Sequence, residues 1–227
     1  LCGPVARVSA TTATLRPESD TVIDCAGRTI DAAAVDTFAF FHDVERARVE
    51  GCTVLGVGFG VVVLGGRDNV IADNHFDVTS DGVTLLASDD NLVDDNVINY
   101  RGLGVVIARG ASRNALEDNQ LTVAAGDVGS ARPGLDRPHL YPDGGPAVLV
   151  DDAPDIAVVT FVIGGEVFQV DNRDITLDGN AIRRNHLIGG DPAAIVIGAR
   201  SAQTRVANND ISGAEYGVRA SGSPDGT

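Results

Sequence analysis

The chain of 227 residues carries a formal net charge of −15 at pH 7 and has an isoelectric point near 4.4. Nucleic acid and anionic membrane surfaces attract proteins with a positive patch, so this charge argues against both as partners. Hydrophobic residues make up 44% of the chain, but aromatic residues only 4%, and neither Met nor Trp occurs. We therefore expect a core of Val, Ile, Leu and Ala in regular layers. No apolar run of about 18 residues is present, which argues against a membrane span in this segment.

The first quarter of the chain holds all three cysteines, Cys2, Cys25 and Cys52. Residues 5–30 are predicted to form the first coil or coils of a repeat, with residues 9–14 as a cap on its open end. Two arrangements of the thiols remain open: a Cys2–Cys25 disulfide, or a buried Cys25 stacked on Cys52. The odd number leaves at least one thiol without a partner in the chain. Because no CxxC or CxxH motif occurs, we expect no zinc site.

An asparagine recurs at nearly constant spacing, with steps of 22 and 23 residues through the middle of the chain. The series comprises Asn74, Asn96, Asn119, Asn185 and Asn209. In the gap before Asn185 we assign the equivalent position to Thr160. Asn side chains stacked at a sharp turn can bond one another and the backbone, so we interpret the series as structural rather than as a binding row.

Each coil also contains a second short apolar run. The corresponding segments are residues 60–63, 82–85, 104–107, 147–149, 168–170, 194–197 and 217–220. Short β-branched runs between Gly, Asn and Asp turns are typical of strands, and a period of about 22 residues leaves no room for a helix in each repeat. The sequence thus predicts an all-β fold, a solenoid of parallel strands with about 8–9 coils over residues 1–220.

A long insertion, residues 124–146, interrupts the repeat before the fourth of these segments. It gathers Asp136, Arg137, His139, Tyr141 and Asp143, and long loops in compact repeats are often functional. An acid, a base and an arginine could abstract a proton α to a uronate carboxylate, with Arg or Ca²⁺ neutralising the charge. The other interpretation is a proline-stiffened lid over apolar surface. Past the last coil, residues 221–227 are expected to be disordered or to lead into a further segment.

The Asn-turn coils, together with the phrase from Asp24 to Asp31, resemble the right-handed parallel β-helix repeats of the pectate lyase-like superfamily. The similarity is greatest to its generic repeat family, which includes the periplasmic copper-maturation proteins of nitrous oxide reductase. The resemblance implies that the strand before each Asn belongs to a second sheet, the strand after it to a third, and the Gly-led strand to a first. It also implies that enzymes of the superfamily work on the first sheet and its flanking loops.

The motifs of individual enzymes in this superfamily are incomplete here. The pair Asp89 and Asp90 resembles the acidic pairs of polygalacturonases, but the Gly-His-Gly and Arg-Ile-Lys elements are missing, so we interpret the pair as a turn. The insertion resembles the Asp-Pro-His-Asp of alginate epimerases only at its Pro-His step. His75 and His186 each follow a series Asn, and we expect them four coils and about 19 Å apart, too far to share a metal ion.

Side chains alternate along a strand, so the outward columns of the first sheet can be predicted. The first column is Val62, Thr84, Val106, Val148, Gln169, Val196 and Arg219. The second is Leu64, Leu86, Ala108, Val150, Asp171, Gly198 and Ser221. An outer face this apolar is expected to be covered, either by the insertion through Leu135, Leu140 and Tyr141 or by another protein chain, including a second copy. Bare or inward-pointing valines would contradict this register.

The sequence favours an extracytoplasmic β-helix scaffold or binding module for a polysaccharide or protein partner. Its location would be extracellular, at the cell surface or periplasmic, as the resemblance implies. The alternative is a polysaccharide lyase or C5-epimerase acting on uronate polymers through residues 124–146, with Ca²⁺. A third reading, a metal-delivery accessory protein, rests on the resemblance alone, and the lack of Met and of clustered His or Cys counts against it.

Overall fold

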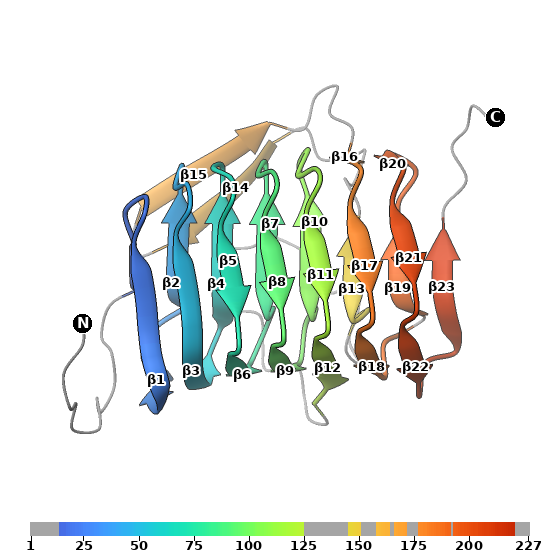
Figure 1. Ribbon diagram of the computed structural model, residues 1–227, viewed down its shortest axis with the longest axis horizontal. Helices are drawn as coiled ribbons and strands as arrows, with labels where there is room; N and C mark the ends of the chain where they lie inside the picture. The colour runs from blue at the N-terminus through green and yellow to red at the C-terminus, as the bar shows by residue number, and fades with distance from the viewer. Residues whose placement is uncertain are drawn as a thin grey trace.

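The chain forms a solenoid of parallel β-strands stacked along one long axis, as the computed structural model in Figure 1 shows. The structure describes residues 14–124, 145–150, 158–163, 166–171, 177–191 and 193–220. Within these residues every regular element is a strand, so no helix is present that could cross a membrane. The predicted all-β parallel β-helix is confirmed, with seven coils where about 8–9 were expected.

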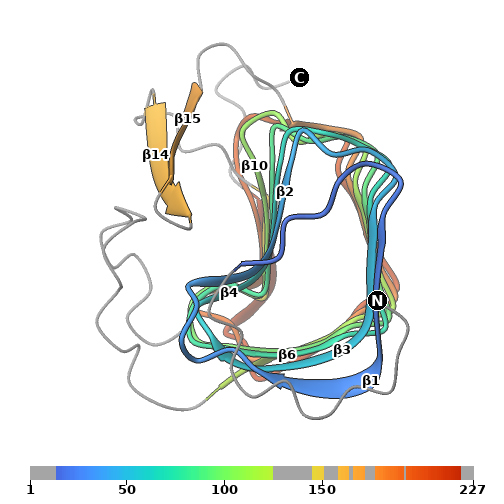
Figure 2. The same cartoon turned by 90° about the vertical axis from the view of Figure 1, so that its left-hand side faces the viewer.

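The first sheet contains one strand from each of the seven coils. In order along the axis these are β2 (Thr37–His42), β4 (Phe59–Leu64), β7 (Val83–Leu86), β10 (Val105–Ala108), β13 (Val148–Val150), β19 (Ala193–Ile197) and β23 (Tyr216–Ala220). All neighbours in this sheet are parallel. In the view along the axis they stack into one wall of the solenoid (Figure 2).

The other two walls begin on one long strand, β3 (Arg48–Val57), which pairs with β1 (Val22–Asp31). The second sheet continues from its first half as β5 (Val70–Ala72), β8 (Leu92–Asp94), β11 (Ala115–Glu117), β17 (Ala181–Arg183) and β21 (Arg205–Ala207). The third continues from its second half as β6 (His75–Val78), β9 (Val97–Tyr100), β12 (Gln120–Val123), β18 (His186–Ile188) and β22 (Asp210–Ser212). A short pair, β16 (Leu177–Asp178) and β20 (Ser201–Ala202), precedes the last second-sheet strands.

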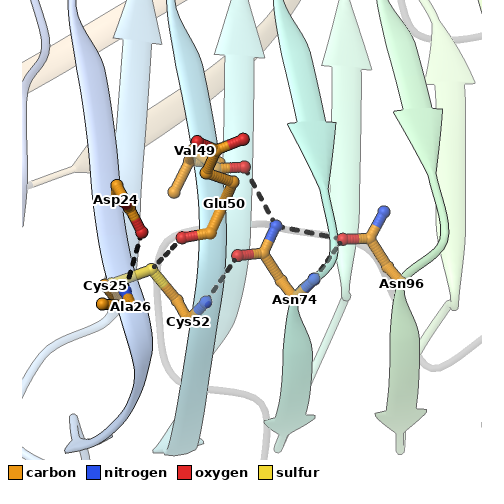
Figure 3. The surroundings of a disulfide bond; sticks show 8 residues. All are labelled: Asp24, Cys25, Ala26, Val49, Glu50, Cys52, Asn74 and Asn96. Carbon is orange, nitrogen blue, oxygen red and sulfur yellow. Dashed lines mark hydrogen bonds between the residues drawn. A yellow bond between two sulfur atoms is a disulfide. The ribbon is translucent and has the colours of Figure 1, made fainter.

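A ladder of buried asparagines forms the corner between the second and third sheets. Asn96 Oδ1 accepts from both the backbone N and Nδ2 of Asn74, at 3.0 Å each (Figure 3). Asn96 in turn donates to Asn119. The same bonds continue through Asn185 to Asn209. The interpretation of the Asn series as structural is therefore confirmed.

A second ladder, Asn69, Asn91, Asn114 and Asn180, forms the corner between the first and second sheets. The residue before each ladder Asn has a left-handed backbone, with φ of 56° at Asp73 and 51° at Asp95. Asp is one of the few non-glycine residues that tolerate this conformation. The corner geometry thus explains why Asp occupies many of these positions.

Aliphatic side chains fill the interior in columns, one residue from each coil. One such column is Ile71, Val93, Leu116 and Ile182, and each member is fully buried. Because neighbouring strands lie about 4.8 Å apart, each coil places its side chain directly on the last one. The prediction of an aliphatic core is confirmed for these columns, but aromatic side chains that it did not include, among them Phe38, Phe76 and Tyr100, are also buried in the core.

The cysteines occupy the first coils, and their arrangement corrects one expectation. Cys25 of β1 and Cys52 of β3 stack on each other, as one alternative predicted, and they form a disulfide (Figure 3). The alternative Cys2–Cys25 pairing is therefore wrong, and Cys2 lies outside the described residues. A bulge in β1 between Asp24 and Arg28 carries Cys25 to its partner.

The chain between Asn119 and Asn185 also differs from the prediction. These two residues are direct ladder partners although they are 66 positions apart, so Thr160 is not part of the ladder. It lies instead in β14 (Val158–Ile163), which pairs antiparallel with β15 (Glu166–Asp171) outside the solenoid (Figure 2). Residues 168–170 therefore do not belong to the first sheet. A Gly-Gly pair at 164–165 between two apolar runs is a hairpin signal that periodicity alone overlooked.

Replacing Asn96 by Ala should destabilise the fold, because it leaves the buried Asn74 N without its acceptor and leaves Asn74 Nδ2 with the Val49 carbonyl oxygen alone. We expect a loss of about 3 kcal/mol in the free energy of unfolding, measured by urea denaturation. Asn99→Ala is the matched control, because Asn99 lies in the same coil on the outer face and should cost less than about 1 kcal/mol. Equal losses for the two variants would contradict a special role for the ladder.

Candidate functional site

The outer face of the first sheet is mainly apolar and buried from β2 to β13, as predicted, and becomes exposed in the last coil. Its outward column is Phe40, Val62, Thr84, Val106, Leu149, Val196 and Arg219. Val62, Leu86 and Val106 belong to a hydrophobic cluster separate from the core, and Ile163 and Phe168 of the β14–β15 hairpin pack on it. The cover therefore includes the chain's own hairpin, while the predicted contacts Leu135, Leu140 and Tyr141 lie outside the described residues.

The predicted columns need correction at the fifth strand, β13, and at the members taken from β15, whereas Val196 and Arg219 lie in the outward column as predicted. Val148 and Val150 pair with Val105 and Ile107, and all four point into the core. Leu149 takes the outward position because β13 is offset by one residue from the predicted register. Gln169 and Asp171 were assigned to this sheet, but they belong to the hairpin strand β15.

A polar and aromatic cluster holds the hairpin at the N-terminal end of this face. Arg16 donates to Glu166 Oε2 at 2.7 Å and to the carbonyl oxygen of Ile163 at 3.2 Å. The Arg16 guanidinium also lies 5.6 Å from the ring centre of Phe40. His42 stacks on Phe40, and Phe168 meets both rings edge-on, with centroids at 5.0 and 4.8 Å. These contacts hold the hairpin against the solenoid. His42 is therefore one of the side chains that pack the hairpin in place.

The insertion residues predicted to carry chemistry, Asp136, Arg137, His139, Tyr141 and Asp143, all lie outside the described residues. The described ends of that insertion do have defined positions. Ala124 N donates to the carbonyl of Tyr100 at 2.7 Å, and Gly145 N donates to that of Gly102 at 2.8 Å. Both ends therefore lie at the turn between the third and first sheets, next to the first-sheet face.

The pair Asp89 and Asp90 is a turn, as interpreted from the sequence. Arg113 of the next coil donates to Asp90 Oδ1 at 2.9 Å and to Asp89 Oδ2 at 3.1 Å. The hydrogen bonds from Arg113 lower the pKa of the Asp90 carboxyl below its ordinary value. Both carboxylates are thus committed to holding adjacent coils together.

The two histidines on the outer face of the third sheet do not lie on neighbouring coils. His75 and His186 are three coils apart, not four, because the coil of Gln120 pairs directly with the coil of His186. The separation is about 14 Å at the sheet spacing, still too far for a shared metal ion. His75 Nε2 lies 3.3 Å from Asn99 Nδ2, and His186 Nδ1 lies 2.9 Å from Asp210 Oδ2.

Coil stacking brings together an acidic group that the sequence analysis did not identify. Oxygen atoms of Asp94, Glu117 and Asp118 lie within 4.8 Å of one another, the spacing of a possible cation site. However, Arg184 contacts Glu117 at 2.6 Å and Asp118 at 2.7 Å, and Arg183 also pairs with Glu117. Hydrogen bonds from these arginines lower the pKa values of Glu117 and Asp118. The group is therefore a salt-bridge network, and alignment of the coils would have revealed it.

Asp94 is the acid of this group without an ion pair to either arginine. Burial raises the pKa of its carboxyl, and repulsion from Asp95, Asp118, Glu117 and Asp73 adds to the shift. A carboxyl whose pKa is higher in the folded state than in the unfolded chain destabilises the fold wherever it is ionised.

Asp94→Asn should therefore stabilise the protein at pH 7, by at most about 1 kcal/mol, or roughly 2–4 °C in Tm. The gain should shrink as the pH falls through the raised folded pKa and vanish below the unfolded value. Thermal unfolding between pH 7 and pH 3 measures it, with Asp77→Asn on the third sheet as control. A gain that persists unchanged at low pH would refute the electrostatic cause.

Comparison with known proteins agrees with the solenoid. The sequence pattern of the family described as "Right handed beta helix region" matches residues 14–131, and no curated protein matches. Among solved structures, the A-module of mannuronan C-5 epimerase AlgE4 from Azotobacter vinelandii shares 17% identity with a TM-score of 0.45. That match covers 97% of this chain and 56% of the epimerase chain.

A tailspike protein of an E. coli bacteriophage, solved with a pentasaccharide, shares 14% identity with a TM-score of 0.29. It matches over 91% of this chain and 44% of its own. The chain thus spans about half the length of both solved proteins.

Proposed function

The chain belongs to the right-handed β-helix family, and we propose that it is a binding module that holds a neutral polysaccharide along the outer face of its third sheet. The observation that carries this proposal is a row of outward-facing side chains, exposed or half-buried and most of them hydrogen-bonding, repeated from coil to coil. Neither the core nor either asparagine ladder uses these side chains. The first-sheet face, by contrast, packs beneath the chain's own hairpin.

The row consists of two outward columns of the third sheet. The first is Thr53, His75, Val97, Gln120, His186 and Asp210. The second is Leu55, Asp77, Asn99, Thr122, Ile188 and Ser212. Successive members lie about 4.8 Å apart on a rigid sheet, so the surface repeats along the axis as a linear polymer does.

The chemistry of the row suits sugar hydroxyls. Amide groups such as those of Asn99 and Gln120, and hydroxyl groups such as that of Thr122, both donate and accept hydrogen bonds. Val97 and Ile188 lie between them and offer apolar surface for the C–H faces of sugar rings. Asp77 and the overall charge of −15 disfavour a polyanion on this face, which is why a neutral polymer is favoured.

An extracytoplasmic location is part of the proposal, and the Cys25–Cys52 disulfide supports it. Disulfides persist in oxidising compartments and are rare in the cytosol. A bridge across 27 residues should stabilise the first coils by about 3–4 kcal/mol. Three titratable thiols in the denatured, unreduced protein from its native source would contradict this location.

Affinity electrophoresis in gels containing a β-glucan, a xylan or a galactomannan tests the binding proposal. We expect at least one polymer to retard the protein, and Gln120→Ala to weaken that binding about tenfold, or roughly 1.4 kcal/mol. Gln203→Ala makes the same change in the turn before β21 of the second sheet, away from the row, and should leave retardation unchanged. No retardation in any gel, or equal weakening by both variants, would contradict the proposal.

A second candidate is a lyase or C5-epimerase acting on uronate polymers, with Ca²⁺ or an arginine neutralising the substrate carboxylate. The position of Ala124 and Gly145 beside the first-sheet face favours it, since the insertion between them carries Asp136, Arg137, His139, Tyr141 and Asp143. Incubation with uronate polymers, with and without Ca²⁺, should then yield unsaturated or epimerised sugars, and His139→Ala should abolish the product. No product, or full activity in His139→Ala, removes this candidate.

A further inference from the structure

The outer face of the second sheet carries a depression between its last two coils. It has a volume of about 260 Å³ and is lined by Gly179, Ala181, Arg183, Gln203, Arg205 and Ala207. Ala181 pairs with Arg205 and Arg183 with Ala207, so these four residues are alternate positions on two adjacent strands and point to the same side of the sheet. Gly179 and Gln203 lie in the turns that precede these two strands.

Small and long side chains alternate across these two coils, and this alternation creates the depression. Gly179, Ala181 and Ala207 form a low floor. Arg183 and Arg205 stand on opposite sides of that floor, with Cα atoms roughly 8 Å apart by one interstrand step and two residues along the strand. In the coil of β8 the equivalent positions hold Leu92 and Asp94, so this pattern is specific to the C-terminal coils.

Arg205 is an exposed arginine whose side chain makes no ion pair or hydrogen bond with the part of the chain that the structure describes. Arg183 pairs with Glu117 on the side away from β21, and one carboxylate contact leaves most of its five N–H donors free. Arg205 therefore presents an unpaired guanidinium beside a small apolar floor, and Arg183 lines the same depression while it pairs with Glu117, in a chain with 32 acidic and 17 basic residues. Gln203 adds an amide at the rim.

We propose that this depression binds a compact oxyanion, a carboxylate, sulfate or phosphate group carried by a small ligand. Planar guanidinium groups bind such oxygens in pairs, and charge-assisted bonds of this kind are about twice as strong as neutral ones. The floor methyl groups of Ala181 and Ala207 contact the apolar part of the ligand. The site lies on a different sheet from the proposed polysaccharide row and takes a ligand of different charge, so it goes beyond that function.

Isothermal titration calorimetry with inorganic phosphate, sulfate and glucuronate, at constant ionic strength, tests the proposal on the full chain. We expect saturable one-site binding of at least one probe, and the tightest probe identifies the oxyanion class. Arg205→Gln should raise its Kd about tenfold or more. Arg219→Gln, which removes an exposed arginine from the first sheet, should leave the Kd unchanged.

Ala181→Leu provides a second variant that keeps all charges and fills the floor. It should abolish binding while thermal unfolding confirms the fold. Loss in both Arg205→Gln and Ala181→Leu, with none in Arg219→Gln, supports the site. No saturable binding of any probe, or an equal change in Arg205→Gln and Arg219→Gln, overturns it. Because none of these probes is a neutral polymer, failure here leaves the polysaccharide result unaffected.

Discussion

The fold depends on a buried amide that finds its partners one coil away. Asn96 is buried, so its donors and acceptor must be met by Asn74, Asn119 and nearby carbonyls. An unpaired buried amide costs on the order of 1–3 kcal/mol, so a coil that misplaces its Asn weakens two neighbours at once. This requirement keeps the coil length at 22 or 23 residues through the central turns. It also holds the corner residues before each Asn, such as Asp95, in a left-handed conformation.

The same requirement decides where extra chain can enter. Extra chain enters the coil in two places, between Ala124 and Gly145 and between Val150 and Leu177, which are the segments before and after the first-sheet strand β13. The two corners marked by Asn114 and Asn119 are uninterrupted. The extra chain disturbs no ladder bond, because Asn114 still donates to Asn180 and Asn119 still donates to Asn185. The described hairpin then packs on the first-sheet face through Ile163 and Phe168. Among the residues that the structure describes, the hairpin covers the first sheet and leaves the outward side chains of the second and third sheets uncovered.

Much of the fold could be predicted from the sequence because the ladder asparagines mark every corner they build. The apolar first-sheet face also followed from simple alternation, and Val62 and Val106 lie where it placed them. The prediction was wrong at residues 168–170 because a hairpin strand alternates like a solenoid strand, and the two are distinguished by the missing Asn at 160 and by the Gly-Gly pair at 164–165. The group of Asp94, Glu117 and Asp118 required stacking neighbours to be known, since residues 23 positions apart become adjacent only in three dimensions.

Charge follows the coil stacking as well. Like charges one coil apart would lie about 4.8 Å from each other, which destabilises a sheet. Along the corners the chain often avoids this by reversing sign, as where Arg46 meets Asp20, Arg113 meets Asp90, and Arg184 meets Asp118. Each such pair is worth little alone in water, but each also keeps adjacent corners in register. Arg205 stands opposite Ala181 rather than an acid, so nothing in the stacking rule accounts for its charge. A cation that the architecture does not need is a reasonable place to look for a ligand.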